Sequence, residues 1–209
     1  IIVTFAIIAL QYYGLKGNNL VPNRIQALFE SSYDFIAHMV DENCGKEARP
    51  FAPLVFSLFM FVLFANLFGM LPYSFTVTSH FAVTFSLALI VFLTVTVLGF
   101  VKHGTHFFSF FCPPGAPLWI TPLLVPMEII SFLIRPITLS VRLFLNMTAG
   151  HILLKVFAGF AVTLGGLWFV GPVLFNTAFI AFEFFVALLQ AYIFTILTCI
   201  YLDDAIHLH

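Results

Sequence analysis

The chain has 209 residues, of which 62% are hydrophobic and only 8% are charged, and its formal net charge is −1. An ordinary soluble domain carries about 25% charged residues, so this composition predicts a membrane protein that crosses the bilayer several times. The near-neutral charge, with no Lys/Arg-rich run, excludes nucleic acid as a partner, and three cysteines without a CxxC pair predict free thiols and no metal site.

The first 40 residues predict two different helices. Residues 1–15 are apolar and contain the pair Tyr12-Tyr13, which is typical of a short transmembrane helix that reaches the interface. Because this stretch is short for a span, we expect that a leader or further residues precede it. Residues 18–40 repeat apolar side chains at helical spacing between charged ones, which favours an amphipathic helix in the membrane interface over a soluble helix packed on another surface.

The middle of the chain predicts a transmembrane hairpin between polar segments. The window 41–50 is expected to be a solvent loop, whereas 51–72 and 79–102 are almost free of charge and long enough to span. Prolines recur through 103–126, so this segment is expected to be an interfacial or re-entrant connector. With this arrangement all loop cations fall on one side, as the positive-inside rule requires: Lys16, Arg24, Lys46, Arg49 and Lys102.

Two long apolar helices are predicted over 127–160 and 172–204, and glycines between them favour an antiparallel hairpin. The first contains Arg142 in mid-helix, where a charge costs about 2.5–3.5 kcal/mol in the membrane. Such a charge needs compensation, and we expect the compensation to be functional.

The spacing of polar residues predicts the register of this hairpin. His151 with Glu183 and Arg142 with Gln190 meet in a single antiparallel register whose turn falls at the glycines. Asn146 lies four residues after Arg142 and therefore shares its face, whereas His151 lies about half a turn round the helix. The first long helix therefore presents two separate polar sites.

Ionisable groups inside a membrane indicate a proton path, because Glu and His can exchange protons while Arg cannot. Structural alternatives remain open for each group. Glu128 and Arg135 can form a structural pair, and His151 and Glu183 can form a static hydrogen bond. Asn146 and Gln190 can form an interhelical contact without a further role. The long side chains of Arg142 and Lys155 can reach the membrane interface, and Asp203 and Asp204 can belong to a solvated terminus.

RLFLNMTAGH over 142–151, followed by Glu183 and Gln190, resembles subunit a of the F-type ATP synthase. The resemblance extends upstream through VPNRIQALFE, LFANLFGMLPYSFTVTSH and PMEIISFLIRPITLSVR. It implies two long helices tilted almost into the membrane plane against a rotating c-ring, with Arg142 as the essential arginine that faces the ring carboxylate. It further implies His151 and Glu183 in the half-channel open to the lumen or periplasm, Glu128 in the half-channel open to the matrix or cytoplasm, and Asn146 and Gln190 as flanking polar positions.

The resemblance also implies partners and a location. We expect the c-ring, the peripheral stalk and other Fo subunits as partners, no cofactor beyond the transported protons and lipids, and no ATP hydrolysis by this chain itself. The order of His151 and Glu183 is similar to that of mitochondrial or alphaproteobacterial members, and we favour the mitochondrial inner membrane, with the bacterial plasma membrane as the alternative. In the family the position of Leu145 is usually Gly or Ala, so we expect Leu145 to point beside the ring contact.

Two other functional classes are weighed against this interpretation. A stand-alone proton channel or secondary transporter is the alternative, but inverted repeats of broken helices are not visible in the sequence. An intramembrane hydrolase would need an HExxH, Ser/His or paired-Asp arrangement, which the sequence lacks.

Overall fold

The computed structural model describes residues 24–70, 77–104, 121–164 and 169–206, and the regular structure in these ranges is entirely helical. The elements are, in chain order, α2 (Arg24–Cys44), the 3-10 helix η1 (Lys46–Phe51), α3 (Ala52–Gly69), the 3-10 helix η2 (Val77–Ser79), α4 (Phe81–His103), α5 (Thr121–Leu164) and α6 (Val170–Ile206). Four helical stretches are long and apolar enough to cross a membrane: Glu47–Gly69, Phe81–His103, Leu123–Thr163 and Val170–Ile206. The predicted all-α membrane fold is confirmed, while the helix expected over 1–15 lies outside the described residues.

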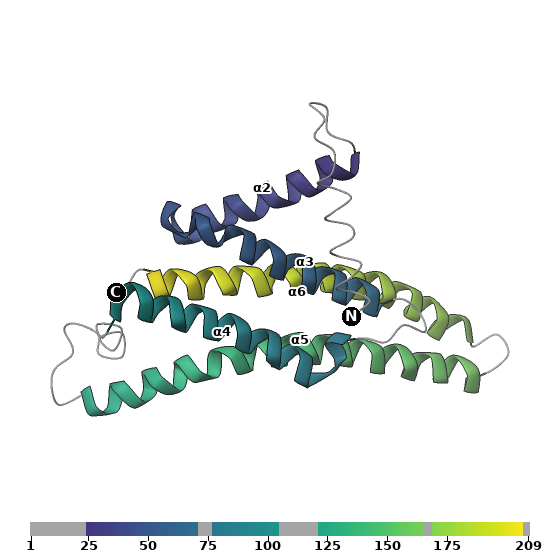
Figure 1. The fold of residues 1–209 in the computed structure, drawn as a ribbon. Coiled ribbons are helices and arrows are strands. Elements are labelled where there is room, and N and C mark those ends of the chain that lie inside the picture. The colour runs from purple at the N-terminus through teal and green to yellow at the C-terminus, as the bar shows by residue number, and fades with distance from the viewer. Residues whose placement is uncertain (1–23, 71–76, 105–120, 165–168, 207–209) are drawn as a thin grey trace.

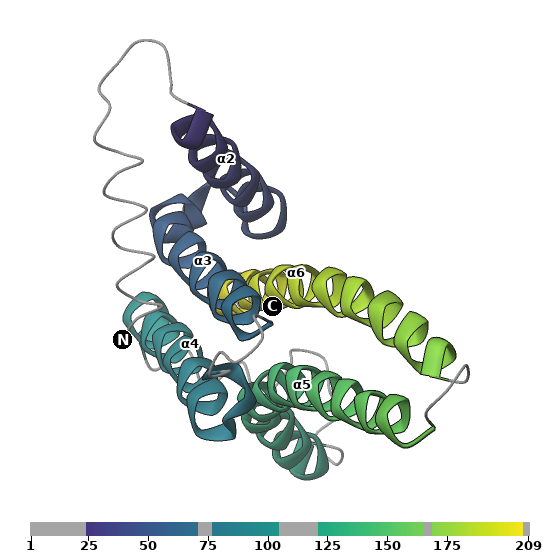
Figure 2. The same ribbon diagram turned by 90° about the vertical axis from the view of Figure 1, so that its right-hand side faces the viewer.

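Helix α6 is the centre of the molecule. A bilayer offers no water to backbone N–H and C=O groups, so the apolar runs form helices, and these helices then pack on one another. As Figures 1 and 2 show, α6 runs beside α5 and also packs against α2, α3 and α4. In its most apolar window α6 is 44% buried, against 17% for α5, so α5 leaves most of its surface free for lipid or a partner.

Two apolar clusters hold these helices together. The first joins α2 and α3 to the C-terminal part of α6, through residues that include Ile36, Val40, Cys44, Val55 and Cys199. The second joins α3, α4, α5 and α6, through residues that include Val62, Val91, Leu139, Leu143 and Phe194. Leu139 and Leu143 therefore fix which face of α5 points inward.

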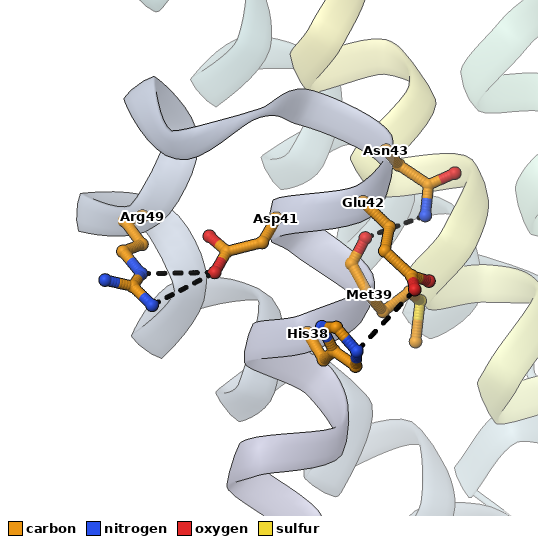
Figure 3. A network of polar contacts seen from close by, with 6 residues as sticks. All are labelled: His38, Met39, Asp41, Glu42, Asn43 and Arg49. Atoms are coloured by element: carbon orange, nitrogen blue, oxygen red, sulfur yellow. Dashed lines mark hydrogen bonds and ion pairs between the residues drawn. The ribbon is translucent and has the colours of Figure 1, made fainter.

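The polar window 41–50 is not the predicted loop. Helix α2 continues to Cys44, Gly45 breaks it with a φ of 71° that favours glycine, and η1 follows directly. Figure 3 shows how the segment is held: Arg49 Nη2 lies 3.1 Å from Asp41 Oδ2, and Asn43 Nδ2 donates to the Met39 carbonyl at 2.7 Å. These local contacts satisfy polar groups that sequence reasoning assigned to solvent. The start predicted for the amphipathic helix, 18–23, lies outside the described residues.

The long helices extend beyond their predicted bounds. Helix α5 begins at Thr121 instead of residue 127 and ends at Leu164, and α6 covers Val170–Ile206 instead of 172–204. Pro122 stands in the first turn of α5, where the N–H groups have no partner within the helix, while Pro126 and Pro136 lie inside α5, so proline content alone overestimates the connector. Residues 105–120 of that connector lie outside the described ranges.

Two cysteines that are distant in the sequence meet in the first cluster. The Cys44 thiol donates to the Cys199 carbonyl at 3.1 Å, and both cysteines are buried and free. Hydrogen bonding to Cys199 and burial together hold the pKa of the Cys44 thiol well above its usual range. This contact fastens the end of α2 to α6, while Cys112 lies outside the described residues.

Candidate functional site

The α5–α6 hairpin arranges the predicted residues in three groups along its length. Glu128 lies near the start of α5, Arg142 lies in its middle, and His151 lies nearer the turn to α6. A helix rises 1.5 Å per residue, so Arg142 lies about 21 Å from Glu128 and about 14 Å from His151 along the axis. Arg142 therefore separates two polar regions.

Arg142 lies at the surface of the described chain, within electrostatic range of Tyr201 on α6. It is exposed, whereas Leu139 and Leu143 on either side of it in the sequence are 1% and 0% exposed and face the second cluster. Among the described residues no carboxylate lies within ion-pair distance of Arg142. Leu145 is 54% exposed one turn later on the same outer side, and whether it lies beside a partner stays a prediction. The outer face of α5 is thus a surface where a partner can supply an anion.

Gln190 is bonded to Asn146. Asn146 Nδ2 donates to Gln190 Oε1 at 3.4 Å, one turn after Arg142 on α5, which is close to the register predicted for Arg142 and Gln190. A direct contact of Arg142 with Gln190 stays a prediction. Gln190 is 3% exposed, and its Nε2 atom has no hydrogen-bond partner within the described residues.

Glu183 is buried against a glycine of α5. A Cβ atom at Gly150 would overlap Glu183 Oε1, so the carboxylate occupies the space that a side chain would fill. Asn146, Gly150, Leu153 and Phe179 are among the residues that line a cavity of about 110 Å³ beside it, large enough for water. Glu183 Oε1 is buried and has no partner in the described part of the chain, and His151 lies close enough to act on the Glu183 charge. The predicted register therefore places His151 within electrostatic range of Glu183.

The charged residues near the start of α5 have other partners than those considered from the sequence. Arg135 Nη1 forms an ion pair with Asp204 Oδ2 at 2.6 Å, and its guanidinium lies 5.2 Å from the Tyr201 ring centre. The structural pair of Arg135 with Glu128, which the sequence left open as an alternative, is not among the ion pairs of the described residues, and Asp204 is not a solvated terminus but an interhelical partner. The reason is that α6 extends far enough to bring Asp204 opposite Arg135.

One polar residue of this region was not predicted as a site residue. Asn66 of α3 is 0% exposed and donates from Nδ2 to the Ala187 carbonyl at 3.4 Å, between Glu183 and Gln190 on α6. Its Oδ1 atom has no partner among described residues. The signal was present in the sequence, since Asn66 is the single amide of an otherwise apolar span.

The chemistry of these groups is proton exchange and charge stabilisation. Carboxyl and imidazole groups bind and release protons, whereas a guanidinium keeps its charge at every physiological pH. Across the ranges that the structure describes, no group of three or more His, Cys, Asp and Glu residues could hold a metal ion. The hairpin thus offers a protonatable pair near its turn, a fixed cation in its middle and charged groups at its other end.

Comparison with known proteins identifies the family. A model of the ATP synthase A chain family matches residues 1–203. ATP synthase subunit a of Rhizobium etli (strain CIAT 652) is 57% identical over 202 residues, which cover 94% of this chain and 81% of the relative. The chain belongs to the ATP synthase A chain family. ATP synthase subunit a of Rhizobium leguminosarum bv. trifolii (strain WSM2304) is 56% identical over the same coverage.

Membership of the ATP synthase A chain family confirms the resemblance seen in the sequence and the predicted function as a proton-translocating membrane subunit of an ATP synthase. The four apolar helices make it a multi-pass membrane protein. Both relatives are bacterial, which favours the bacterial plasma membrane over the mitochondrial inner membrane of the sequence prediction.

Proposed function

We propose that this chain guides protons through two offset half-channels that meet at a ring of c subunits, with Arg142 as the partition between them. The observation that carries the proposal is an exposed arginine in the middle of an apolar helix, without a carboxylate partner in the described chain and between two polar regions. A cation in the membrane is costly, so an anion supplied by a partner is the simplest compensation.

On the access side, His151 and Glu183 deliver protons to a ring carboxylate. The cavity beside Glu183 supports this role, because it borders a buried carboxylate oxygen without a protein partner and has room for water. The neutral carboxyl that results can face lipid cheaply, whereas the ionised form cannot. Asn146 and Gln190, bonded to each other near Arg142, flank the point of transfer.

At the centre, Arg142 favours the deprotonated ring carboxylate. Its pKa is too high for it to relay a proton, so it separates the half-channels electrostatically and prevents a direct leak. After nearly a full turn of the ring, the proton leaves toward Glu128. Each proton that crosses 100 mV supplies about 2.3 kcal/mol, which drives the rotation.

The partners follow from the same surface. The outer face of α5 carries Leu145 among many exposed apolar residues, which suits a ring of apolar helices in a bilayer. The peripheral stalk and other Fo subunits hold the chain stationary, and we place the complex in a bacterial plasma membrane. The chain does not itself hydrolyse ATP; catalysis belongs to the soluble subunits of the complex.

The decisive experiment replaces Arg142 in the assembled complex. Arg142→Ala should abolish proton-driven ATP synthesis in inverted vesicles while the complex still assembles. Lys155→Ala is the matched control, because it removes another exposed cation of the same helix outside the site. Synthesis retained by Arg142→Ala, at the level of the Lys155→Ala control, would contradict the proposal.

A further inference from the structure

Helix α6 carries three polar side chains in one stripe, and only two of them have a place in the route above. Asn176, Glu183 and Gln190 follow one another at intervals of seven residues, which is nearly two helical turns. Each has a buried polar atom without a hydrogen-bond partner in the described chain, namely Asn176 Oδ1, Glu183 Oε1 and Gln190 Nε2. The stripe spans about 21 Å of the helix axis.

Aromatic residues lie next to Asn176 along α6. Its neighbour Phe175 lies 4.2 Å from Phe157 of α5 and 6.1 Å from Phe179, measured between ring centres. Rings of this kind offer no strong acceptor or donor to an amide, and buried amide oxygens in proteins are nearly always hydrogen-bonded to protein or to water. An Asn held in such a place therefore marks a position that binds water.

The position of Asn176 relates it to the access cavity. That cavity reaches Phe179, which lies one turn beyond Asn176 along the stripe, and continues to Glu183. From Glu183, away from the turn of the hairpin, the stripe reaches Gln190, which is bonded to Asn146 near Arg142. Of the three polar residues in the stripe, Asn176 is thus the one nearest the turn of the hairpin and farthest from Arg142.

We propose that Asn176 is a positioning residue that holds water at the outer mouth of the access half-channel. The inference rests on the proposed function of Glu183 as the proton-delivering acid. An amide neither gains nor loses a proton at physiological pH, so Asn176 orients water and does not relay. Its loss should slow the supply of protons and leave the chemistry at Glu183 intact.

The first test compares substitutions at this position in the assembled complex. Asn176→Leu should lower passive proton conduction of F1-stripped vesicles by about threefold to tenfold, the range expected for one lost hydrogen bond. Asn176→Ser should conduct better than Asn176→Leu, because a hydroxyl also binds water. A merely structural role predicts the opposite order, since leucine fills the volume of asparagine and serine leaves a hole. Thr177→Val is the control, because the Thr177 hydroxyl already donates to the Val173 carbonyl on the exposed side.

The second test asks directly whether water reaches the position. Asn176→Cys should make proton conduction sensitive to silver ions, whereas conduction by the wild type should not respond. Leu174→Cys is the control, because the Leu174 side chain is 66% exposed on the surface of α6, and conduction by this variant should not respond either. This measurement decides the question if the leucine variant fails to assemble. Wild-type conduction by Asn176→Leu, or equal silver sensitivity of both cysteine variants, would overturn the inference.

Failure of this inference can be told from failure of the proposed function. Glu183→Gln and Arg142→Ala are measured in the same vesicles. If both abolish synthesis while the Asn176 variants behave as wild type, only the role of Asn176 is wrong. If Glu183→Gln retains synthesis, the access route itself is wrong.

Discussion

Gly150 leaves the space that the Glu183 carboxylate occupies, so the acid of α6 can lie directly against the backbone of α5. A Cβ atom there would meet the carboxylate at a distance that real side chains do not adopt. The position of the Glu183 carboxylate therefore depends on the lack of a side chain at Gly150 of α5. Replacing that glycine moves the proton-carrying group without changing its chemistry.

Gly150→Ala should lower passive proton conduction by about tenfold or more, because the Glu183 carboxylate or the hairpin must shift. Gly159→Ala is the matched control on the same helix, since a Cβ atom at Gly159 meets nothing within 4 Å. Combining Gly150→Ala with the shorter acid Glu183→Asp should recover part of the conduction. Equal conduction in the two alanine variants would show that the contact is unimportant.

The charged residues of the site could be predicted from the sequence, because charged residues are rare in an apolar helix. Arg142 and Glu183 stand out by type alone, and the antiparallel register of the hairpin placed His151 with Glu183. Gly150 and the backbone contact of Asn66 could not be predicted, because they depend on how closely two helices approach. The pairing of Asn146 with Gln190 depends on which side of α5 faces outward, which the periodicity of an almost uniformly apolar helix does not determine.

The far ends of α5 and α6 are joined by the Arg135–Asp204 ion pair. The side chains are 21% and 31% exposed, and the Arg135 guanidinium also lies near the Phe132 and Tyr201 rings. Partial burial makes this pair stronger than a solvent-exposed one, on the order of 1 kcal/mol. Its structural effect is to keep Arg135 neutralised, so that Arg142 is the cation left for the ring.

Asp204→Asn should lower the temperature at which the complex loses activity and also slow ATP synthesis, because it removes the carboxylate that pairs with a half-buried cation. The exchange Arg135→Asp with Asp204→Arg should restore part of both losses. Glu42→Gln provides the comparison, since the side chains of the His38–Glu42 pair are 76% and 67% exposed, and we expect almost no change. Single and double variants with the same loss would contradict an interhelical role.

The contact of α2 with α6 predicts the reactivity of Cys44. Hydrogen bonding to Cys199 and burial raise the pKa of the Cys44 thiol, so the folded chain keeps this proton at a pH where the unfolded chain loses it. The contribution to the free energy of unfolding is present below about pH 8.5 and decreases as the pH rises above that value. Stability at this contact therefore decreases in alkaline solution.

Iodoacetamide should leave Cys44 unmodified in the native complex at pH 8.5 and modify it after denaturation in detergent, as measured by mass spectrometry of its peptide. Glu42→Cys is the control, because its side chain is 67% exposed in the native protein and should react at once. Native modification of Cys44 at the rate of the control would show that α2 does not pack against α6 as described.

Considered as a whole, the molecule has helices much longer than a bilayer is thick. Helix α5 has 44 residues and α6 has 37, which correspond to about 66 Å and 55 Å, against a hydrocarbon core of about 30 Å. Apolar helices of this length lie within the core only if they are strongly inclined or curved, and Figure 1 shows α5 curving beneath α6. The length supports the expected inclination, which stays a prediction.

Charge placement predicts the orientation of the whole chain. Lys102 at the end of α4 pairs with Glu47 of η1 at 2.6 Å, so the positively charged ends of these elements lie together. A membrane-impermeant thiol reagent should therefore label Glu42→Cys from the cytoplasmic face and Phe169→Cys from the opposite face. Labelling of both variants from one face would contradict this arrangement. The wild type, treated with the same reagent, measures the labelling of the native cysteines.

The central position of α6 has a consequence for how the chain is made. The chain leaves the ribosome with its N-terminus first. Helices α2 to α5 therefore enter the membrane before α6, on which all of them pack, has been made. Until α6 arrives, Asn66 lacks the Ala187 carbonyl to which it is bonded, and Cys44 lacks Cys199. The nascent chain therefore exposes polar groups to lipid until its last helix is inserted, and during that interval it is most in need of an insertase and most open to proteolysis.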